Sequence, residues 1–225
     1  MNDILGAMDS DVKPSPPKRR YDVSRRRMAA AETRRAIIAA ARRLFLEHGY
    51  AATTMPAIAE AAGVALDTVY ATIGPKPALF RHLIELAISG ADQPVPAEER
   101  DYVRAIRGEP DPRRKLALYA HAIRMIHPRL APLFRVLREA ARGEPELAAL
   151  WTEIAERRAR NMRLFVTDVA AAGGLRAGVT MDEAADLVWA TNAPEFYLLL
   201  VDERGWDPER FERWLTELWI RVLLP

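Results

Sequence analysis

Residues 59–76, with the sequence AEAAGVALDTVYATIGPK, contain two short helical patterns separated by a glycine. The first pattern ends near Ala62, and Gly63 can form the turn because glycine accepts a positive φ without steric cost. The second pattern begins near Ala65 and stops at Gly74, directly before a proline. The stretch therefore predicts two short helices joined by a tight turn.

The positions of three particular residues along this stretch indicate how the two helices pack. Ala59 is small enough for the two backbones to come close, Gly63 makes the turn, and Val69 returns an apolar side chain from the second helix. This pattern meets the geometric demands of a helix-turn-helix, whose second helix lies in the major groove of DNA. The alternative is a helical hairpin inside an ordinary bundle.

Local signals also bound the neighbouring helices. A first helix is expected over 29–48, and Gly49 follows it in the usual position after a helix end. Thr54 is a good N-cap for the next helix. A fourth helix is expected over 76–89.

The rest of the chain continues with helical patterns, and no segment alternates with period two long enough to predict a strand. The sequence therefore predicts an all-α fold in three parts: a flexible basic arm (1–28), a three-helix helix-turn-helix domain (29–80) and a larger helical domain (81–225). A T-x-x-E capping box begins at Thr180, and Asp207 precedes a proline at a helix start. The helices of the larger domain are expected at 97–107, 112–126, 129–142, 144–172, 181–203 and 207–223.

Positive charge is concentrated near the start of the chain. The formal net charge is only +2, but residues 18–43 contain ten basic side chains and two acidic ones. Such an end favours a polyanionic partner, either nucleic acid or an anionic membrane, although it could also be a solubilising tail. Arg25, Arg26 and Arg27 could reach a minor groove from a flexible arm, attract phosphates without specificity, or have no role.

Several classes of site are not expected. The chain has no cysteine, no apolar run of bilayer length and no signal-peptide pattern, so a cytoplasmic location is expected. Its four histidines have no metal-binding spacing, and nucleotide-binding and nucleophile motifs are missing. Carboxylates lie on charged faces such as WTEIAERRAR (151–160), which is typical of solvated helices. No catalytic site, metal or cofactor is therefore expected.

Residues 33–80, TRRAIIAAARRLFLEHGYAATTMPAIAEAAGVALDTVYATIGPKPALF, resemble the DNA-binding domain of the tetracycline-repressor (TetR) family of transcriptional regulators. The matching features are LFLEHGY at the end of the first helix, TTMPAIAEAAGV in the second, DTVY in the recognition helix and Lys76 at the start of the fourth. The chain departs from the family at Ala65, Ile73 and Gly74, where Ser or Thr, Phe and Pro are usual.

The resemblance implies a set of DNA contacts. Each also has a structural alternative: a threonine can be only a helix cap, an aspartate only a partner of the helix dipole, and a tyrosine partly core. The implied phosphate contacts are Thr54, Tyr70 and Lys76, and the implied base-edge or groove contacts are Leu66, Asp67, Thr68 and Thr72.

The larger domain is expected to dimerise and to hold a small molecule. The segments 181–203 and 207–223 carry more apolar side chains than one helix face can bury, which favours a homodimer interface, although these side chains could be core. Pro194 is expected to kink a helix beside Asn192. The side chains that could line an effector pocket, or be core instead, are Tyr119, Met125, Phe134, Trp151, Met162, Phe165 and Asn192, with His121 and His127 as further candidates.

Together these features predict a ligand-responsive DNA-binding regulator. The resemblance implies a homodimer on a near-palindromic operator, and a repressor is the commonest role in that family. The alternative is a helical interaction or membrane-surface protein that uses the basic first helix. An enzyme would need a convergent polar pocket, which the sequence does not display.

Overall fold

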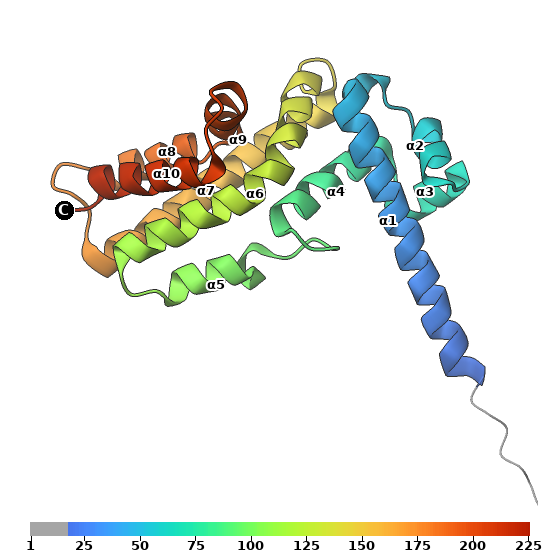
Figure 1. The fold of residues 1–225 in the computed structure, drawn as a ribbon, viewed down its shortest axis with the longest axis horizontal. Coiled ribbons are helices and arrows are strands. Elements are labelled where there is room, and N and C mark those ends of the chain that lie inside the picture. Colours follow the sequence, from blue (N-terminus) through green and yellow to red (C-terminus); the bar gives the residue numbers. More distant parts are fainter. Residues whose placement is uncertain (1–17) are drawn as a thin grey trace, which may run out of the picture.

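The computed structural model describes the backbone of residues 18–225 and the side chains of residues 25–225. Every regular element in this range is a helix (Figure 1), so the predicted all-α fold is confirmed. The elements are α1 (Lys18–Ala52), α2 (Met55–Ala62), α3 (Leu66–Ile73), α4 (Lys76–Ser89), the single turn η1 (Ala97–Glu99), α5 (Asp101–Gly108), α6 (Pro112–Ala140), α7 (Pro145–Gly173), α8 (Met181–Thr191), α9 (Pro194–Tyr197), the π-helical segment η2 (Leu198–Glu203) and α10 (Pro208–Leu223).

Helix α1 begins at Lys18, eleven residues earlier than the sequence predicts. The expectation of a flexible arm is therefore wrong for residues 18–28, and the rest of that arm lies outside the described residues. Arginine and alanine are strong helix formers, and the run RRRMAAAE (25–32) contains little else. A charge-rich segment without an apolar stripe can therefore extend an existing helix.

The end of the first helix is the one predicted. Gly49 has φ +77° and interrupts the helical geometry. The buried Thr53 hydroxyl lies 3.1 Å from the carbonyl oxygen of Leu44 and 2.7 Å from that of Gly49, so its hydrogen is shared between two carbonyls near the end of the helix. Thr54 then caps α2 by accepting the N–H of Ala57 at 3.2 Å, as predicted.

Helices α1–α4 form a small unit, here called the reader domain. Gly63 has φ +66° in the turn between α2 and α3, and Val69 is fully buried, so the predicted helix-turn-helix packing is present. Aromatic rings close the core: Phe80 of α4 contacts Phe45 edge to face at a centroid distance of 5.1 Å. The core also buries Ile37 and Ile58 completely.

Helices α6 and α7 run side by side through the larger domain, with α8 on α7 and α10 on α6 (Figure 1). α6 also packs against α1, α4, α5 and α9. It continues through Pro128 and Pro132, so the predicted division into 112–126 and 129–142 is wrong. An internal proline costs about 3 kcal/mol, but burial on both sides of it, including Ile126 and Leu130, favours one continuous helix.

The predicted helix over 181–203 is also divided. α8 ends at Thr191, Ala193 has extended geometry, and Pro194 is the first residue of α9. Pro194 therefore begins a new helix and does not kink a continuous one. The predicted capping box at Thr180 and the cap at Asp207 are both present.

Candidate DNA-reading surface and effector cavity

Helix α3 has an outward face that can meet a ligand as large as DNA. Its buried side is Val69, while Asp67 is exposed and Leu66 and Tyr70 are 36% and 46% exposed. Thr68 and Thr72 are half-buried. The residues implied as base contacts therefore share one short helix, and their DNA contacts stay a prediction.

Lys76 lies at the start of α4, just after α3 in the chain. Its Nζ sits 4.1 Å from the centroid of the Tyr50 ring, which holds the ammonium by a cation–π interaction. Burial lowers the pKa of Lys76, with the charge of Glu144 acting the other way. Burial, with the nearby Glu144 and Glu146, raises the pKa of Tyr50 to about 12, so the phenol is neutral at pH 7. The lysine is thus held in place beside α3.

Arg34 fixes the end of α3, which sequence reasoning missed. Its Nη1 donates to the carbonyl of Thr72 at 3.2 Å, and its Nη2 lies 3.0 Å from Nε2 of His82. Burial and the Arg34 charge lower the pKa of His82. One side chain of α1 therefore joins α3 and α4. The sequence showed Arg34 only as part of a basic cluster.

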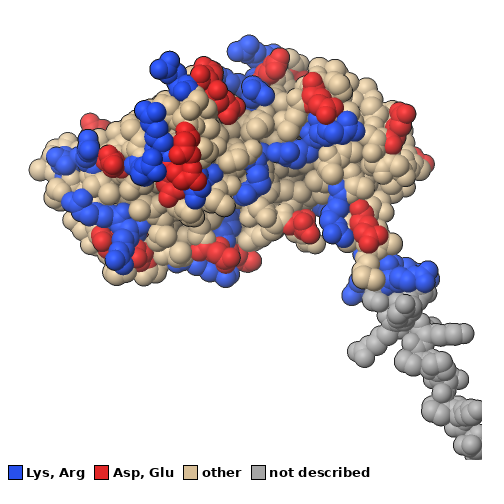
Figure 2. Space-filling view, viewed as in Figure 1, with Lys and Arg blue, Asp and Glu red and all other residues tan. Residues whose placement is uncertain are grey.

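The first part of α1 projects away from the body, beside the reader domain (Figure 1). Lys and Arg side chains gather in Figure 2 where the projection leaves the body of the molecule. Arg25, Arg26 and Arg27 are all exposed. Successive helical residues point about 100° apart, so three consecutive arginines on a helix do not face one groove together. These three arginines therefore belong to a helix and not to a flexible arm, and their DNA contacts stay a prediction.

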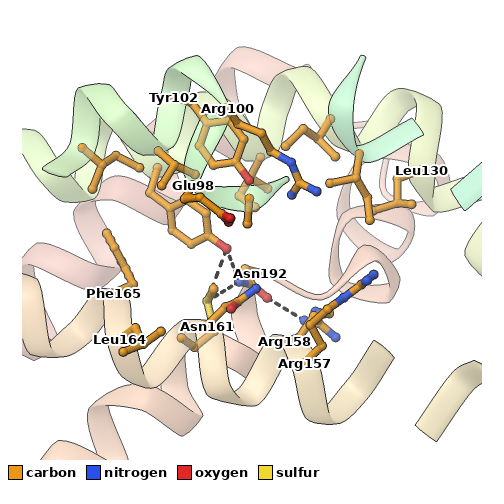
Figure 3. A pocket seen from close by; sticks show the side chains of 18 of the residues that line it. Glu98, Arg100, Tyr102, Leu130, Arg157, Arg158, Asn161, Leu164, Phe165 and Asn192 are labelled. Atoms are coloured by element: carbon orange, nitrogen blue, oxygen red, sulfur yellow. Dashed lines mark hydrogen bonds between the residues drawn. The ribbon is translucent and has the colours of Figure 1, made fainter. Parts of the chain in front are cut away.

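A cavity of about 1010 Å³ lies among α4, α5, α6 and α7 (Figure 3). Five predicted pocket residues line it: Tyr119, Phe134, Met162, Phe165 and Asn192.

Three other candidates lie elsewhere. Trp151 lines a second cavity of about 370 Å³. Met125 is 49% exposed and lines neither cavity, so its placement in the pocket is wrong: it points outward from α6. His121 is exposed and contacts Glu212 at 3.2 Å, away from the cavity.

Asn192 organises the polar part of the cavity wall. It is 3% exposed, and its Nδ2 donates to the Tyr119 hydroxyl at 2.7 Å and to Sδ of Met162 at 2.8 Å. Its Oδ1 accepts from Nη2 of Arg158 at 2.5 Å, as drawn in Figure 3. Burial raises the pKa of Tyr119 strongly, so this hydroxyl stays neutral. The break between α8 and α9 thus delivers an amide to the cavity.

Charged residues of the cavity wall were also missed by sequence reasoning. Glu85 of α4 binds Arg157 at 2.6 Å and lies 4.0 Å from Arg100. Asp168 also lines the cavity and binds, at 2.6 Å, the buried Lys115, which is 3% exposed and is not part of the lining. The segment WTEIAERRAR was interpreted as a solvated face, but Arg157 and Arg158 within it line the cavity. The only signal that could have found them is their position on the same turn as Ile154.

His127 lines the cavity and is 2% exposed. Its ring contacts Tyr197 edge to face, and its Nδ1 has no hydrogen-bond partner among the described residues. Burial, and then the charge of Arg158, lower its pKa from 6.5 to about 3. The imidazole is therefore neutral at physiological pH.

This histidine predicts a loss of stability in mild acid. In the unfolded chain His127 titrates near 6.5, so between pH 7 and 5 the unfolded state binds a proton that the folded state refuses. The contribution is complete above 6.5 and is lost as the pH falls toward 3. We expect the free energy of unfolding to fall by about 2 kcal/mol from pH 7 to pH 5 through this residue. Urea unfolding at pH 7, 6 and 5 measures it.

The matched variant is His127→Leu, which removes the titrating group and keeps an apolar side chain of similar size. Between pH 7 and pH 5, the unfolding free energy of this variant is expected to fall less than that of the wild type, and the difference between the two falls is about 2 kcal/mol. Equal pH profiles for the two proteins would show that His127 does not carry the effect.

Two kinds of site are not found in the part of the chain that the structure describes. No group of three or more His, Asp or Glu side chains there is placed to hold a metal ion. None of the helices in residues 18–225 is long and apolar enough to cross a bilayer. Two candidate functional features are the outward face of α3 and the cavity. Helix α4 runs from one to the other. This arrangement is typical of a DNA-binding protein with a cavity in its larger domain.

Comparison with known proteins agrees with this class. Residues 37–83 match the family model of the bacterial regulatory proteins of the tetR family. No curated protein matches the chain in sequence.

Solved structures match over most of the chain. NalD of Pseudomonas aeruginosa, the secondary repressor of the MexAB-OprM multidrug efflux pump, is 25% identical, with 87% of this chain and 98% of that chain covered and a TM-score of 0.67. The flavonoid-responsive regulator FrrA is 28% identical, with 86% and 97% covered and a TM-score of 0.53. FadR from Bacillus subtilis, solved with stearoyl-CoA, shares the fold at 23% identity, with 82% and 96% covered and a TM-score of 0.63.

The resemblance to TetR-family transcriptional regulators is therefore confirmed: the regular elements of residues 18–225 are helices, and residues 37–83, which contain the helix-turn-helix, match the model of that family. The family and these structural neighbours are regulators and not enzymes.

Proposed function

We propose that the protein is a ligand-responsive repressor that binds a near-palindromic operator as a homodimer. The observation that carries this proposal is the path of α4. The helix starts at Lys76 beside the exposed face of α3, and its far end contributes Glu85 and Ile88 to the cavity wall. A molecule in the cavity therefore contacts the same helix that supports the DNA-reading face.

Two charged contacts connect α4 to α7, the opposite wall of the cavity. Arg81 binds Glu153 through two hydrogen bonds of 2.6 and 2.7 Å, and Glu85 binds Arg157 at 2.6 Å. A ligand that binds one arrangement of α4 and α7 more tightly shifts the population toward it by its differential affinity. If that arrangement binds the operator less well, the ligand releases the protein from DNA, and the protein acts as a repressor in the absence of ligand.

The names of two similar proteins support this direction. NalD is a repressor and FrrA responds to a flavonoid. For the dimer, the candidate interface is α8 to α10, where Leu199 is 49% exposed and Phe196, Trp214 and Leu218 are only partly buried. Two copies are needed because one helix-turn-helix buries too little surface for specific binding.

The membrane-surface alternative needs an apolar face on the basic first helix. Ile37, Ala41 and Phe45 provide that face, and each is fully buried in the reader domain. No specific observation therefore favours lipid binding by α1.

Selection of bound sequences from a random DNA duplex pool tests the proposal. We expect the full-length protein, at near-physiological salt, to enrich an inverted repeat. Recovery of bound DNA without a common motif would mean that the protein contributes only non-specific charge, and the regulator proposal would be wrong.

A further inference from the structure

The cations around the cavity differ in whether a carboxylate neutralises them. Lys115 has Asp168 at 2.6 Å, and Arg157 and Arg100 share Glu85. Arg107 is exposed to solvent. Arg158 alone among the half-buried or buried cations of this wall has no carboxylate within 4.0 Å in the described part of the chain.

The contacts of Arg158 are all with neutral groups. Its Nη2 donates to the carbonyl oxygen of Trp189 at 2.8 Å and to Oδ1 of Asn192 at 2.5 Å. Its guanidinium lies 5.2 Å from the Trp189 ring. Burial lowers the pKa of Arg158, because water is removed from the charge, while Tyr119 and the carboxylate of Glu195 act the other way. Glu195 lines the second cavity together with Arg158 and does not line the larger one. These contacts fix the side chain and leave the hydrogens on Nε and Nη1 without a protein acceptor.

The surroundings of Arg158 are apolar on the cavity side. Helices α5, α6 and α7 supply the apolar wall, and the Tyr119 ring contacts the Phe165 ring in a tilted arrangement at a centroid distance of 4.6 Å. The neighbouring His127 is neutral at pH 7, so it adds no second charge. The apolar lining includes Ile106, Ile123, Ile126, Leu130, Phe134 and Phe165.

We infer that the effector is an apolar molecule with one anionic group, such as a carboxylate, which binds Arg158 while its body fills the apolar wall. This inference rests on the proposed function, in which the cavity holds an effector. A half-buried guanidinium with no carboxylate within 4.0 Å gains more from an anionic acceptor than from a neutral one, because only the anion neutralises its charge. The volume of the cavity leaves room for a sizeable apolar body.

An acidic side chain on the opposite wall of the cavity would favour a cationic ligand instead of an anionic one. Glu98 is exposed and faces the cavity from η1, across from Arg158 (Figure 3). If Glu98 selected the ligand, a cation would bind best. Because Glu98 is exposed, water screens its charge more than that of Arg158.

Isothermal titration calorimetry on the full-length protein tests the inference with decanoate, 1-decanol and decylamine, which share a chain and differ in charge. The naphthyl series 1-naphthaleneacetate, 1-naphthaleneethanol and 1-naphthaleneethylamine repeats the test with an aromatic body. In at least one series we expect the acid to bind at least about tenfold tighter than its alcohol, as a charge-assisted hydrogen bond provides, and tighter than its amine. Equal or tighter binding of the alcohol or the amine, or no binding in either series, would overturn the inference.

Three variants show whether Arg158 causes the preference. Arg158→Met should bring acid and alcohol to the same affinity, while Arg158→Lys should keep a reduced preference for the acid. Arg160→Met removes an exposed cation from the same helix and should change nothing. A preference for the acid that survives Arg158→Met would refute the role of Arg158. If that variant does not fold, the affinities of the wild-type protein for acid, alcohol and amine decide the class of ligand.

Operator binding, measured on the same preparations, separates this inference from the proposed function. A protein that selects an operator but shows no acid preference refutes only the anionic effector. A protein that selects no operator refutes the regulator proposal itself, whatever binds in the cavity.

Discussion

Replacing Thr68 and Lys76 together by alanine is expected to weaken operator binding by at least about 100-fold, because each protomer loses one groove contact and one phosphate contact. Thr68 lies half-buried on α3, and Lys76 is held over the Tyr50 ring beside it. Removing the lysine should also lower the dependence of binding on salt concentration, because fewer counter-ions are released. Fluorescence anisotropy with the selected operator, at several salt concentrations, measures both effects.

The matched control removes the same two kinds of side chain elsewhere. Thr167 and Arg160 both lie exposed on α7, far from α3 in the fold, and their double alanine variant should bind the operator as the wild type does. Thermal unfolding of both variants shows whether each is folded. If the Thr68 and Lys76 variant is folded and keeps its affinity, the outward face of α3 is not the reader.

Replacing Phe80 by alanine is expected to lower the free energy of unfolding by about 3–5 kcal/mol, the usual loss for a buried phenylalanine. Phe80 is 0% exposed, and its ring contacts Phe45 at 5.1 Å and Tyr50 at 5.5 Å. Removing it opens a cavity where α1 and α4 meet. Urea unfolding followed by circular dichroism gives the size of the loss, and hydrogen exchange should place it in α1–α4.

Met28→Ala is the control for this substitution. Met28 is 59% exposed on α1, and its removal should change stability by no more than about 0.5 kcal/mol. A loss below about 1 kcal/mol for Phe80→Ala would mean that the aromatic cluster does not hold the reader domain together.

The sequence predicts the short helices well because their ends depend on local chemistry. Thr54 caps α2 through a hydroxyl three residues from its partner, and Gly63 takes a positive φ in the turn that follows. Such signals act over a few residues, so they can be recognised before the fold is known. The fold class and the reader domain follow from them.

The wrong and missed predictions have a different physical origin, because they concern residues whose structure depends on distant parts of the chain. Pro128 is a local signal to stop, and burial along α6, which only the fold provides, overrides it. Arg34 and Arg158 belong to charged runs that are typical of solvated faces, but their partners Thr72 and Asn192 lie 38 and 34 residues away. Contacts over such separations leave no periodic pattern in the sequence. The charged side chains of the cavity wall were therefore missed, while Asn192 and part of the aromatic lining were predicted.

The length of α4 sets how far a small change at the cavity travels. With 14 residues at about 1.5 Å each, the helix is about 21 Å long. A rigid helix held near Glu85 and turned by about 10° moves its Lys76 end by about 2 Å, because these two residues are separated by about 14 Å of helical rise. The rise between base pairs is about 3.4 Å. In the proposed homodimer, a tilt of this size would displace the start of α4, next to the outward face of α3, by about two thirds of that step, enough to shift both halves of the dimer against their sites.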